Sequence, residues 1–220
     1  MLVFLDLKTT GNEQDEKVCA ISVLSGDDYF FDLVNDGKKI APEASAVHHI
    51  SNDMIKDKQH FVDTKSFAFL QELNENDILV VHDYQFISSV LKSYDLYVSA
   101  KIIDTKRVVK HTVSDIERFD LQYLRYELQL LGTLEAVYKP LEDVVVIKSL
   151  FEYLLQSVTK EKMFDFSFEH VLLQKFNFGK YNGRYIEEIV GIDPHYLHWM
   201  LSLENLDADL RYTIEYYLQG

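Results

Sequence analysis

The chain has 220 residues, of which 22 are Lys or Arg and 36 are Asp or Glu, so its formal net charge is −14. This acidity excludes a strong non-specific attraction to polyanions, so any contact with nucleic acid has to be local. No apolar stretch approaches the ~20 residues of a membrane helix, and no secretory signal is visible at the N-terminus. The single cysteine, Cys19, cannot form an internal disulfide, so we expect a cytoplasmic protein without membrane contact.

The first eleven residues predict the centre of the fold. Leu2 to Leu5 form an uninterrupted apolar run, which is typical of a strand buried on both faces of a sheet. We expect this strand to end at Asp6, because Thr9, Thr10 and Gly11 then favour a turn. The sequence therefore predicts that the carboxylate of Asp6 lies at the edge of the sheet, where loops can surround it.

Two β-rich runs follow, Val18 to Leu24 and Tyr29 to Val34, and a polar turn that contains Gly26 joins them. This pattern predicts a hairpin and, with the first strand, three neighbouring antiparallel strands. Further strands are expected over 77–82 and 101–105, and helices over 52–57, 64–73, 86–91, 119–128 and 141–155. Strands that alternate with helices after an opening meander predict an α/β protein with a mixed sheet flanked by helices.

The composition changes near residue 160, where residues 159–162 are charged and turn-like. We expect a boundary from there to about Phe168, between one domain of ordinary size over residues 1–160 and a small α+β module over residues 168–220.

The run Asp6-Leu7-Lys8-Thr9-Thr10-Gly11 resembles the first motif of the DEDD superfamily of 3′-5′ exonucleases, the group of RNase T and the polymerase proofreading subunits. That motif is a strand followed by Asp-x-Glu-Thr-Thr-Gly, so every position matches except the second carboxylate, where this chain has Lys8. The resemblance implies a ribonuclease H-like fold. It also implies four carboxylates around two divalent metals, and a His or Tyr that handles the proton of the attacking water.

The other two family motifs are also altered. The second is His-Asn-x-x-Phe-Asp, and here Asp83 stands at the asparagine while Ile87 replaces the catalytic Asp. The third is a His followed five residues later by an Asp, and here Tyr138 stands at the histidine while Asp143 keeps the carboxylate. Some branches of the family use a tyrosine to orient a water molecule, but that tyrosine lies four residues before the Asp and Tyr138 lies five before it, so Tyr138 is more simply a substituted histidine.

Only Asp6 and Asp143 remain of the four carboxylates, and Lys8 adds a positive charge where dications would bind. Two-metal catalysis is therefore expected to be lost, and we predict that Lys8 pairs with both carboxylates in place of the missing metal. One alternative is that Lys8 extends into solvent. Another is that Asp6, Asp83 and Asp143 hold one weakly bound Mg²⁺ or Mn²⁺; otherwise we expect no cofactor.

Two adjacent histidines follow the third predicted strand. The family often has Val-His-Gly-Ile-Thr here, so His48 keeps the family position and His49 replaces the glycine. Because adjacent residues point to different sides of a strand or helix, we do not expect the two histidines to bind a metal together.

The segment from Phe176 to Leu218 contains Phe-Gly-Lys-x-x-Gly and Asp-Pro-x-Tyr-Leu-x-Trp, and it resembles the small module that follows exodeoxyribonuclease X-like domains. The resemblance implies a clamp on nucleic acid. Lys180 and Arg184 are the expected phosphate contacts, because a small fold has little structural need for them. Aromatic side chains available for stacking on bases are Tyr181, Tyr185 and Trp199. These rings could instead fill the core of the module, which is the interpretation we favour for Trp199.

Three functions are compatible with these motifs. The first, which the altered motifs favour, is a catalytically impaired exonuclease, a pseudoenzyme that binds single-stranded DNA or RNA or a protein partner. The second is an active but atypical metal-dependent 3′-5′ exonuclease that uses Asp6, Asp83 and Asp143. The third is an acidic protein-interaction scaffold that does not bind nucleic acid.

Overall fold

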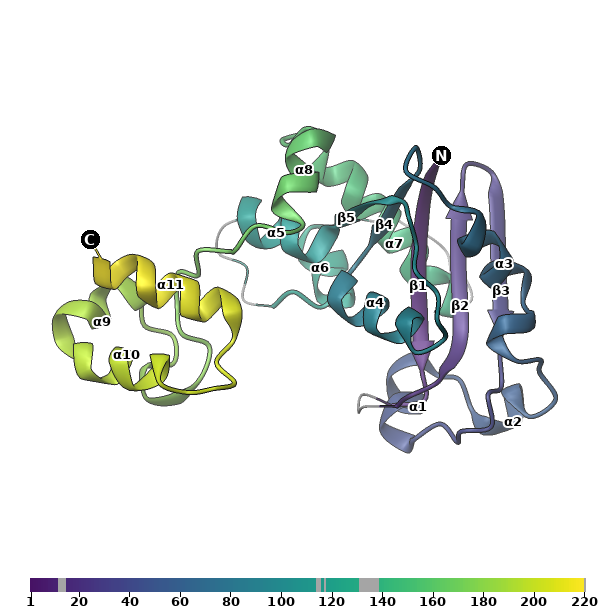
Figure 1. Ribbon diagram of the computed structural model, residues 1–220, viewed down its shortest axis with the longest axis horizontal. Helices are drawn as coiled ribbons and strands as arrows, with labels where there is room; N and C mark the ends of the chain where they lie inside the picture. Colours follow the sequence, from purple (N-terminus) through teal and green to yellow (C-terminus); the bar gives the residue numbers. More distant parts are fainter. Residues whose placement is uncertain (12–14, 114–115, 117, 131–138, 220) are drawn as a thin grey trace. The chain divides into compact units, whose positions relative to one another are not determined.

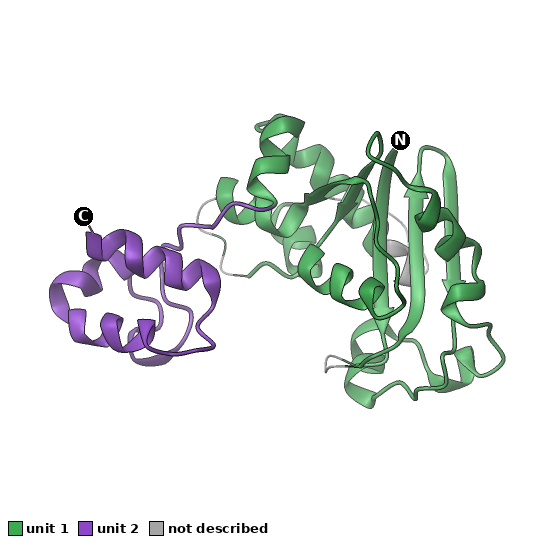
Figure 2. Ribbon diagram, in the orientation of Figure 1, with its two compact units in different colours: residues 1–167 green, residues 168–220 purple. Residues whose placement is uncertain are grey.

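The computed structural model describes the chain except residues 12–14, 114–115, 117, 131–138 and 220, and the side chains of residues 139–142. The chain divides into two compact units, Met1–Ser167 and Phe168–Gly220 (Figure 2).

The first unit is built on a five-stranded sheet with the order β3-β2-β1-β4-β5. Strand β1 (Leu2–Thr9) pairs antiparallel with β2 (Val18–Ser25), which pairs antiparallel with β3 (Asp28–Leu33). Strands β4 (Ile78–Val81) and β5 (Lys101–Asp104) extend the sheet in parallel pairing on the other side of β1. The mixed sheet and the opening meander are confirmed, and β1 lies at the centre of the sheet (Figure 1).

Strand β1 is longer than the sequence indicated, because it continues past Asp6 to Thr9. Its pairing with β2 persists through Lys8 before the register shifts. Successive side chains of a strand point to opposite faces, so Asp6 and Lys8 share one face while Leu5 and Leu7 share the other. The carboxylate and the ammonium are therefore held within the sheet and not on a loop.

Helices cover both faces of the sheet. The face with Leu5 and Leu7 packs against α3 (Lys65–Glu72) and α4 (Tyr84–Lys92) in one apolar cluster. The helices that contribute to the cluster of the opposite face are α5 (Thr105–Thr112), α6 (Leu121–Glu127), α7 (Lys139–Leu154) and α8 (Lys160–Phe166). Two short helices follow β3, α1 (Pro42–His48) and α2 (Asn52–Ile55), and a 3₁₀ turn, η1 (Phe61–Asp63), precedes α3.

Helix α8 occupies the segment that the sequence indicated as a boundary. Met163 is fully buried in the cluster of the second face, so this segment belongs to the first unit. The Ser167 hydroxyl ends the helix by donating a hydrogen bond to the Met163 carbonyl (2.7 Å), and it accepts one from the Asp104 amide (2.9 Å). A charged stretch that looked like a linker is therefore an amphipathic helix attached to the end of β5.

The second unit contains α9 (Ile186–Ile192), α10 (Pro194–Leu201), α11 (Ala208–Gln219) and the 3₁₀ turn η2 (Gly179–Tyr181). These helices bury a separate apolar cluster. The β component of the described module is one isolated bridge between Lys175 and Tyr185. Throughout the described ranges, no helix is both long and apolar enough to cross a membrane.

Candidate functional site at strand β1

Lys8 lies between two carboxylates. Its Nζ is 2.9 Å from Asp6 Oδ2 on the same strand, and it donates a hydrogen bond to Asp143 Oδ2 on α7. All three side chains are largely shielded from solvent, with exposed fractions of 15% for Asp6, 17% for Lys8 and 16% for Asp143. The predicted pairing is confirmed, and the alternative in which Lys8 extends into solvent is wrong. We call these three residues the Lys8 cluster.

Asp143 has a second partner. Its Oδ1 accepts a hydrogen bond from Gln122 Nε2 on α6, and Gln122 Oε1 in turn accepts one from Arg125 (3.3 Å). Both oxygens of Asp143 are therefore bound by donors of this chain. The sequence did not identify Gln122, and the available signal was only a polar residue between apolar positions of the predicted helix. Tyr138, expected at the place of the family histidine, lies outside the described residues.

The cluster combines one ammonium with two carboxylates, so it carries one net negative charge when all three groups are ionised. Burial raises the pKa of Asp6 to about 6, with Lys8 opposing this rise and Asp143 adding to it. Burial lowers the pKa of Lys8, but Asp6 and Asp143 outweigh this effect, so the pKa of Lys8 lies above its ordinary value. Lys8 therefore stays charged, and Asp6 is the member that takes up a proton as the pH falls.

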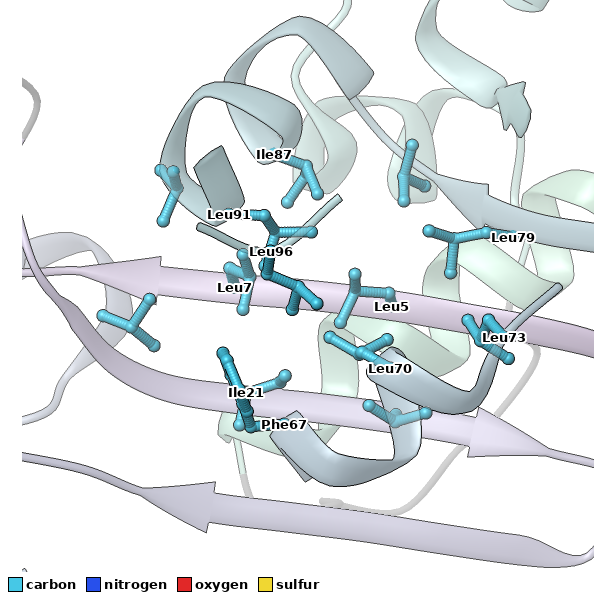
Figure 3. Packing of buried hydrophobic residues seen from close by; sticks show 14 of the residues in the cluster. Leu5, Leu7, Ile21, Phe67, Leu70, Leu73, Leu79, Ile87, Leu91 and Leu96 are labelled. Atoms are coloured by element: carbon cyan, nitrogen blue, oxygen red, sulfur yellow. The ribbon is translucent and has the colours of Figure 1, made fainter. Parts of the chain in front are cut away.

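Ile87 stands where the family has a catalytic carboxylate, and it belongs to the apolar core. Its side chain is only 3% exposed and lies in the cluster that contains Leu5, Leu7 and Leu91 (Figure 3). Leu5 and Leu7 point away from the face that carries Asp6 and Lys8. The structure therefore places Ile87 with the residues of the opposite face and not in the Lys8 cluster.

Asp83 caps helix α4. Its Oδ1 accepts a hydrogen bond from the Phe86 amide (3.1 Å), and its Oδ2 accepts one from Lys106 Nζ (2.7 Å). Burial raises the pKa of Asp83, but the hydrogen bonds from Lys106 and the Phe86 amide and the nearby positive charge together outweigh this effect, so the pKa lies below its ordinary value. Among the described residues, no three His, Cys, Asp or Glu side chains are arranged to hold a metal.

His48 and His49 have separate structural roles. His48 Nδ1 accepts a hydrogen bond from the Ile50 amide (3.1 Å), and its Nε2 lies 3.2 Å from the Thr9 carbonyl, which attaches α1 to the end of β1. Burial lowers the pKa of His48, consistent with a neutral ring. His49 follows α1 with a φ of 60°, in the left-handed region, which explains why the family pattern has a glycine at this position.

In the second unit, Lys180 and Arg184 both form ion pairs. Lys180 Nζ lies 2.8 Å from Asp193 Oδ2 and 4.8 Å from the centroid of the Tyr181 ring, and Arg184 Nη2 lies 3.1 Å from Glu188 Oε2. Asp193 also caps α10 through the Tyr196 amide, so Lys180 supports a helix start. The expectation that a small fold has no structural use for these two charges is therefore wrong.

The aromatic residues of this unit do not behave alike. The prediction that Trp199 fills the core is wrong, because Trp199 is 55% exposed and packs against Tyr196 at a ring distance of 5.5 Å. Leu197 and Met200 occupy the core positions of α10. Tyr185 is 45% exposed and lies beneath the ammonium of Lys175.

Two family models match this chain. The model described as "Exonuclease" matches residues 3–140, and the model described as "Exodeoxyribonuclease X-like C-terminal" matches residues 176–207. Exodeoxyribonuclease 10 of Escherichia coli strain K12 is 24% identical over 228 aligned positions that cover 100% of both chains. The DNA polymerase III subunit epsilon of Treponema pallidum is 24% identical over 169 positions, covering 71% of this chain and 77% of the relative.

Solved structures show the same fold. Exonuclease X in complex with 5′ overhanging duplex DNA superposes with a TM-score of 0.60 at 21% identity, covering 76% of this chain and 99% of the other. The nuclease domain of 3′hExo, a DEDDh family member bound to rAMP, gives a TM-score of 0.53 at 14% identity, and the match covers 70% of this chain and 91% of the other. The predicted ribonuclease H-like architecture is therefore confirmed.

Proposed function

This chain belongs to the exonuclease family whose model matches residues 3–140, and we propose that it is a member impaired in cleavage, which binds nucleic acid without degrading it. The observation that carries the proposal is the position of Lys8 between Asp6 and Asp143. In a metal-dependent nuclease these oxygens would be free to bind dications, whereas here they are bound by an ammonium.

The electrostatics of the cluster oppose metal binding. A solved structure of NrnC from Brucella melitensis contains Mg²⁺, and divalent cations of this kind require hard oxygen ligands with negative charge. A dication ~4 Å from the Lys8 ammonium would be repelled by about 8 kcal/mol at an effective dielectric constant of ~20. The two carboxylates that would offset this repulsion already have partners in Lys8 and Gln122. The residues present do not fit the two-metal site of the family, and we propose that none is resident.

The binding part of the proposal rests on family membership and fold. Exonuclease X, whose fold this chain shares, was solved with duplex DNA. Lys180, Arg184, Tyr181 and Tyr185 are proposed contacts in the C-terminal module, because the side chains of Lys180 and Arg184 are 60% and 54% exposed and a phosphate can compete for them. A single strand of DNA or RNA is the proposed ligand. A cytoplasmic location, supported by the single buried cysteine, is part of the same proposal.

A nuclease assay on end-labelled single-stranded DNA, with Mg²⁺ or Mn²⁺, tests the loss of cleavage. We expect no shortening by the natural chain and metal-dependent shortening by Lys8→Glu, which restores a carboxylate at the family position. Asp6→Ala in the Lys8→Glu background should abolish the gained activity. Cleavage by the natural chain that disappears with Asp6→Ala would instead establish the active, atypical exonuclease.

A second candidate function is an acidic protein-interaction scaffold. It is favoured by the net charge of −14 and by the exposed apolar side chains of the second unit. Those that are at least 45% exposed are Phe168, Phe178, Tyr185, Ile192, Trp199 and Tyr216. The absence of any binding to single-stranded DNA or RNA at low salt would favour this function over the first.

A further inference from the structure

Three cation–aromatic pairs connect residues of α5, of the segment that leads into α6 and of α6 itself. The pairs, with the distance from the cation to the ring centroid, are Lys110–Phe119 (5.7 Å), Arg118–Tyr123 (5.5 Å) and Arg125–Tyr126 (5.3 Å). We call these six residues the α6 surface. None of them belongs to the motifs that the sequence singled out.

Two members of the α6 surface are exposed, and Lys110, Phe119, Tyr123 and Arg125 are half-buried. Tyr126 is 73% exposed, and the Arg118 side chain is 67% exposed. Leu124, between Tyr123 and Tyr126, is fully buried in the core and fixes the helix. The exposed rings therefore stand on a rigid support, and a rigid aromatic face can accept a stacked base with little loss of side-chain entropy.

The α6 surface is joined to the Lys8 cluster by hydrogen bonds. Gln122 lies on the same helix, donates to Asp143 and accepts from Arg125. A ligand that contacts Arg125 and Tyr126 would therefore be separated from Asp143 only by Gln122. Asp143 lies at the site where the family carries out its chemistry.

The charge pattern favours a polyanion at this place more than in the second unit. Residues 105–127 contain five Lys or Arg and four Asp or Glu, whereas residues 168–220 contain four Lys or Arg and eight Asp or Glu. Arg118 pairs with Asp120 at 2.9 Å, but both side chains are exposed, at 67% and 48%, so a phosphate can displace the carboxylate. Cations that alternate with aromatic rings suit a single strand, whose phosphates and unpaired bases need both kinds of contact.

We propose that the α6 surface is the main binding site for a single nucleic-acid strand, with bases stacked on Tyr126 and Tyr123 and phosphates held by Arg118 and Arg125. The assignment rests on the proposed non-cleaving, nucleic-acid-binding function and places its principal contacts in the first unit. The C-terminal contacts at Lys180 and Arg184 are then secondary.

The test is fluorescence anisotropy with the full chain and a labelled oligothymidylate of about 12 nucleotides, within the ~4–16 that one such site covers, at low salt with EDTA. Arg118→Ala combined with Tyr126→Ser should weaken binding at least about ten-fold, and Arg118→Ala alone should reduce the slope of log K against log salt by about 0.7. Tyr126→Phe should retain the affinity, because it keeps the ring.

Two matched controls should leave binding unchanged. Tyr97→Ser removes a tyrosine of similar exposure, 69%, and Lys162→Ala removes a cation that lies 4.6 Å from the Phe166 ring on α8. Thermal unfolding of every variant checks that each remains folded.

The possible failures are distinguishable. If the natural chain binds the oligonucleotide and only Lys180→Ala with Arg184→Ala weakens binding, the α6 assignment is overturned and the proposed function stands. If polyglutamate displaces the oligonucleotide and Tyr126→Ser has no effect, the surface serves an acidic protein, and the strand assignment is overturned. If the natural chain binds no oligonucleotide at low salt, both proposals fail.

Discussion

On one face of strand β1, Leu5 and Leu7 pack with Ile87 in an apolar cluster; on the other, Asp6 and Lys8 meet Asp143 in a charged one. Both faces involve a position where the family has a carboxylate and this chain does not. At position 87 the isoleucine side chain packs in the apolar core. At position 8 a lysine stands in place of a carboxylate metal ligand, and its ammonium pairs with the two remaining carboxylates. The side chain of Ile87 is therefore held by apolar packing, whereas that of Lys8 is held by ion pairs alone.

This difference explains what structural role the two remaining carboxylates have. Asp6 and Asp143 together neutralise an ammonium that is 17% exposed, so removing both would leave a shielded charge without a partner. It also predicts that the Lys8 position can be reverted more easily than the Ile87 position.

Ile87→Asp should have the largest effect on stability. A carboxylate in this apolar cluster has no partner, so we expect a loss of about 3–5 kcal/mol in the free energy of unfolding. Urea denaturation measures it, with Ile87→Val as the control that should cost only about 0.5–1.5 kcal/mol. A cost for Ile87→Asp no larger than that of the control would show that Ile87 faces the Lys8 cluster after all.

Lys8→Met should come next, because it leaves two shielded carboxylates facing each other. We expect a loss of about 2–3 kcal/mol at pH 7, below the full cost of breaking a buried pair because Asp6 can take up a proton. Adding Asp6→Asn and Asp143→Asn should recover most of the loss, since the unpaired charges are then gone. If the triple variant is no more stable than Lys8→Met, charge balance is not what the carboxylates provide.

The pH dependence of stability probes the same cluster. Because the pKa of Asp6 rises from 3.8 to about 6 on folding, the folded chain binds the proton more tightly than the unfolded chain between these values. The contribution of Asp6 to stability therefore falls as the pH rises from about 4 to about 6, by on the order of 3 kcal/mol, and is constant above that range. Asp6→Asn should remove this slope, and identical pH profiles for the two proteins would contradict the assignment.

His49→Gly should give the smallest effect, and it concerns a third position where this chain differs from the family pattern. The φ of 60° at His49 is accessible to glycine without steric cost, so we expect a gain of about 0.5–1 kcal/mol in the free energy of unfolding. Denaturation beside His48→Gly, which removes a buried and hydrogen-bonded ring and should destabilise, gives the contrast. A loss of stability with His49→Gly would mean that the His49 side chain contributes more than the strain costs.

The sheet could be predicted from the sequence because its signals are local: the apolar run before Asp6 and the two β-rich runs around Gly26 specify neighbouring strands. The pairing of Lys8 with Asp143 joins residues 135 apart, and it could be predicted only because the resemblance to the family motifs placed both residues in one site. The end of β1 was missed because Thr9 and Thr10 suit a strand as well as a turn, and pairing with β2 decided the outcome.

What the sequence could not show depends on contacts between distant segments. The hydrogen bond from Gln122 to Asp143 joins residues that lie 21 positions apart in the sequence, and the one from Lys106 to Asp83 joins residues 23 positions apart. The segment that forms helix α8 was predicted to be a linker because many of its residues are charged. Only the burial of Met163 shows that this helix packs against the first unit. Trp199 was expected in the core of the module, but Leu197 and Met200 already fill it.

Calorimetric titration with Mn²⁺ tests most directly the claim that Lys8 stands in for a metal. We predict that the natural chain shows no binding heat that depends on Asp6, and that Lys8→Glu, with three carboxylates in place of two, gains Mn²⁺ binding that Asp6→Asn removes. Mn²⁺ binding by the natural chain that is lost with Asp6→Asn would contradict the account.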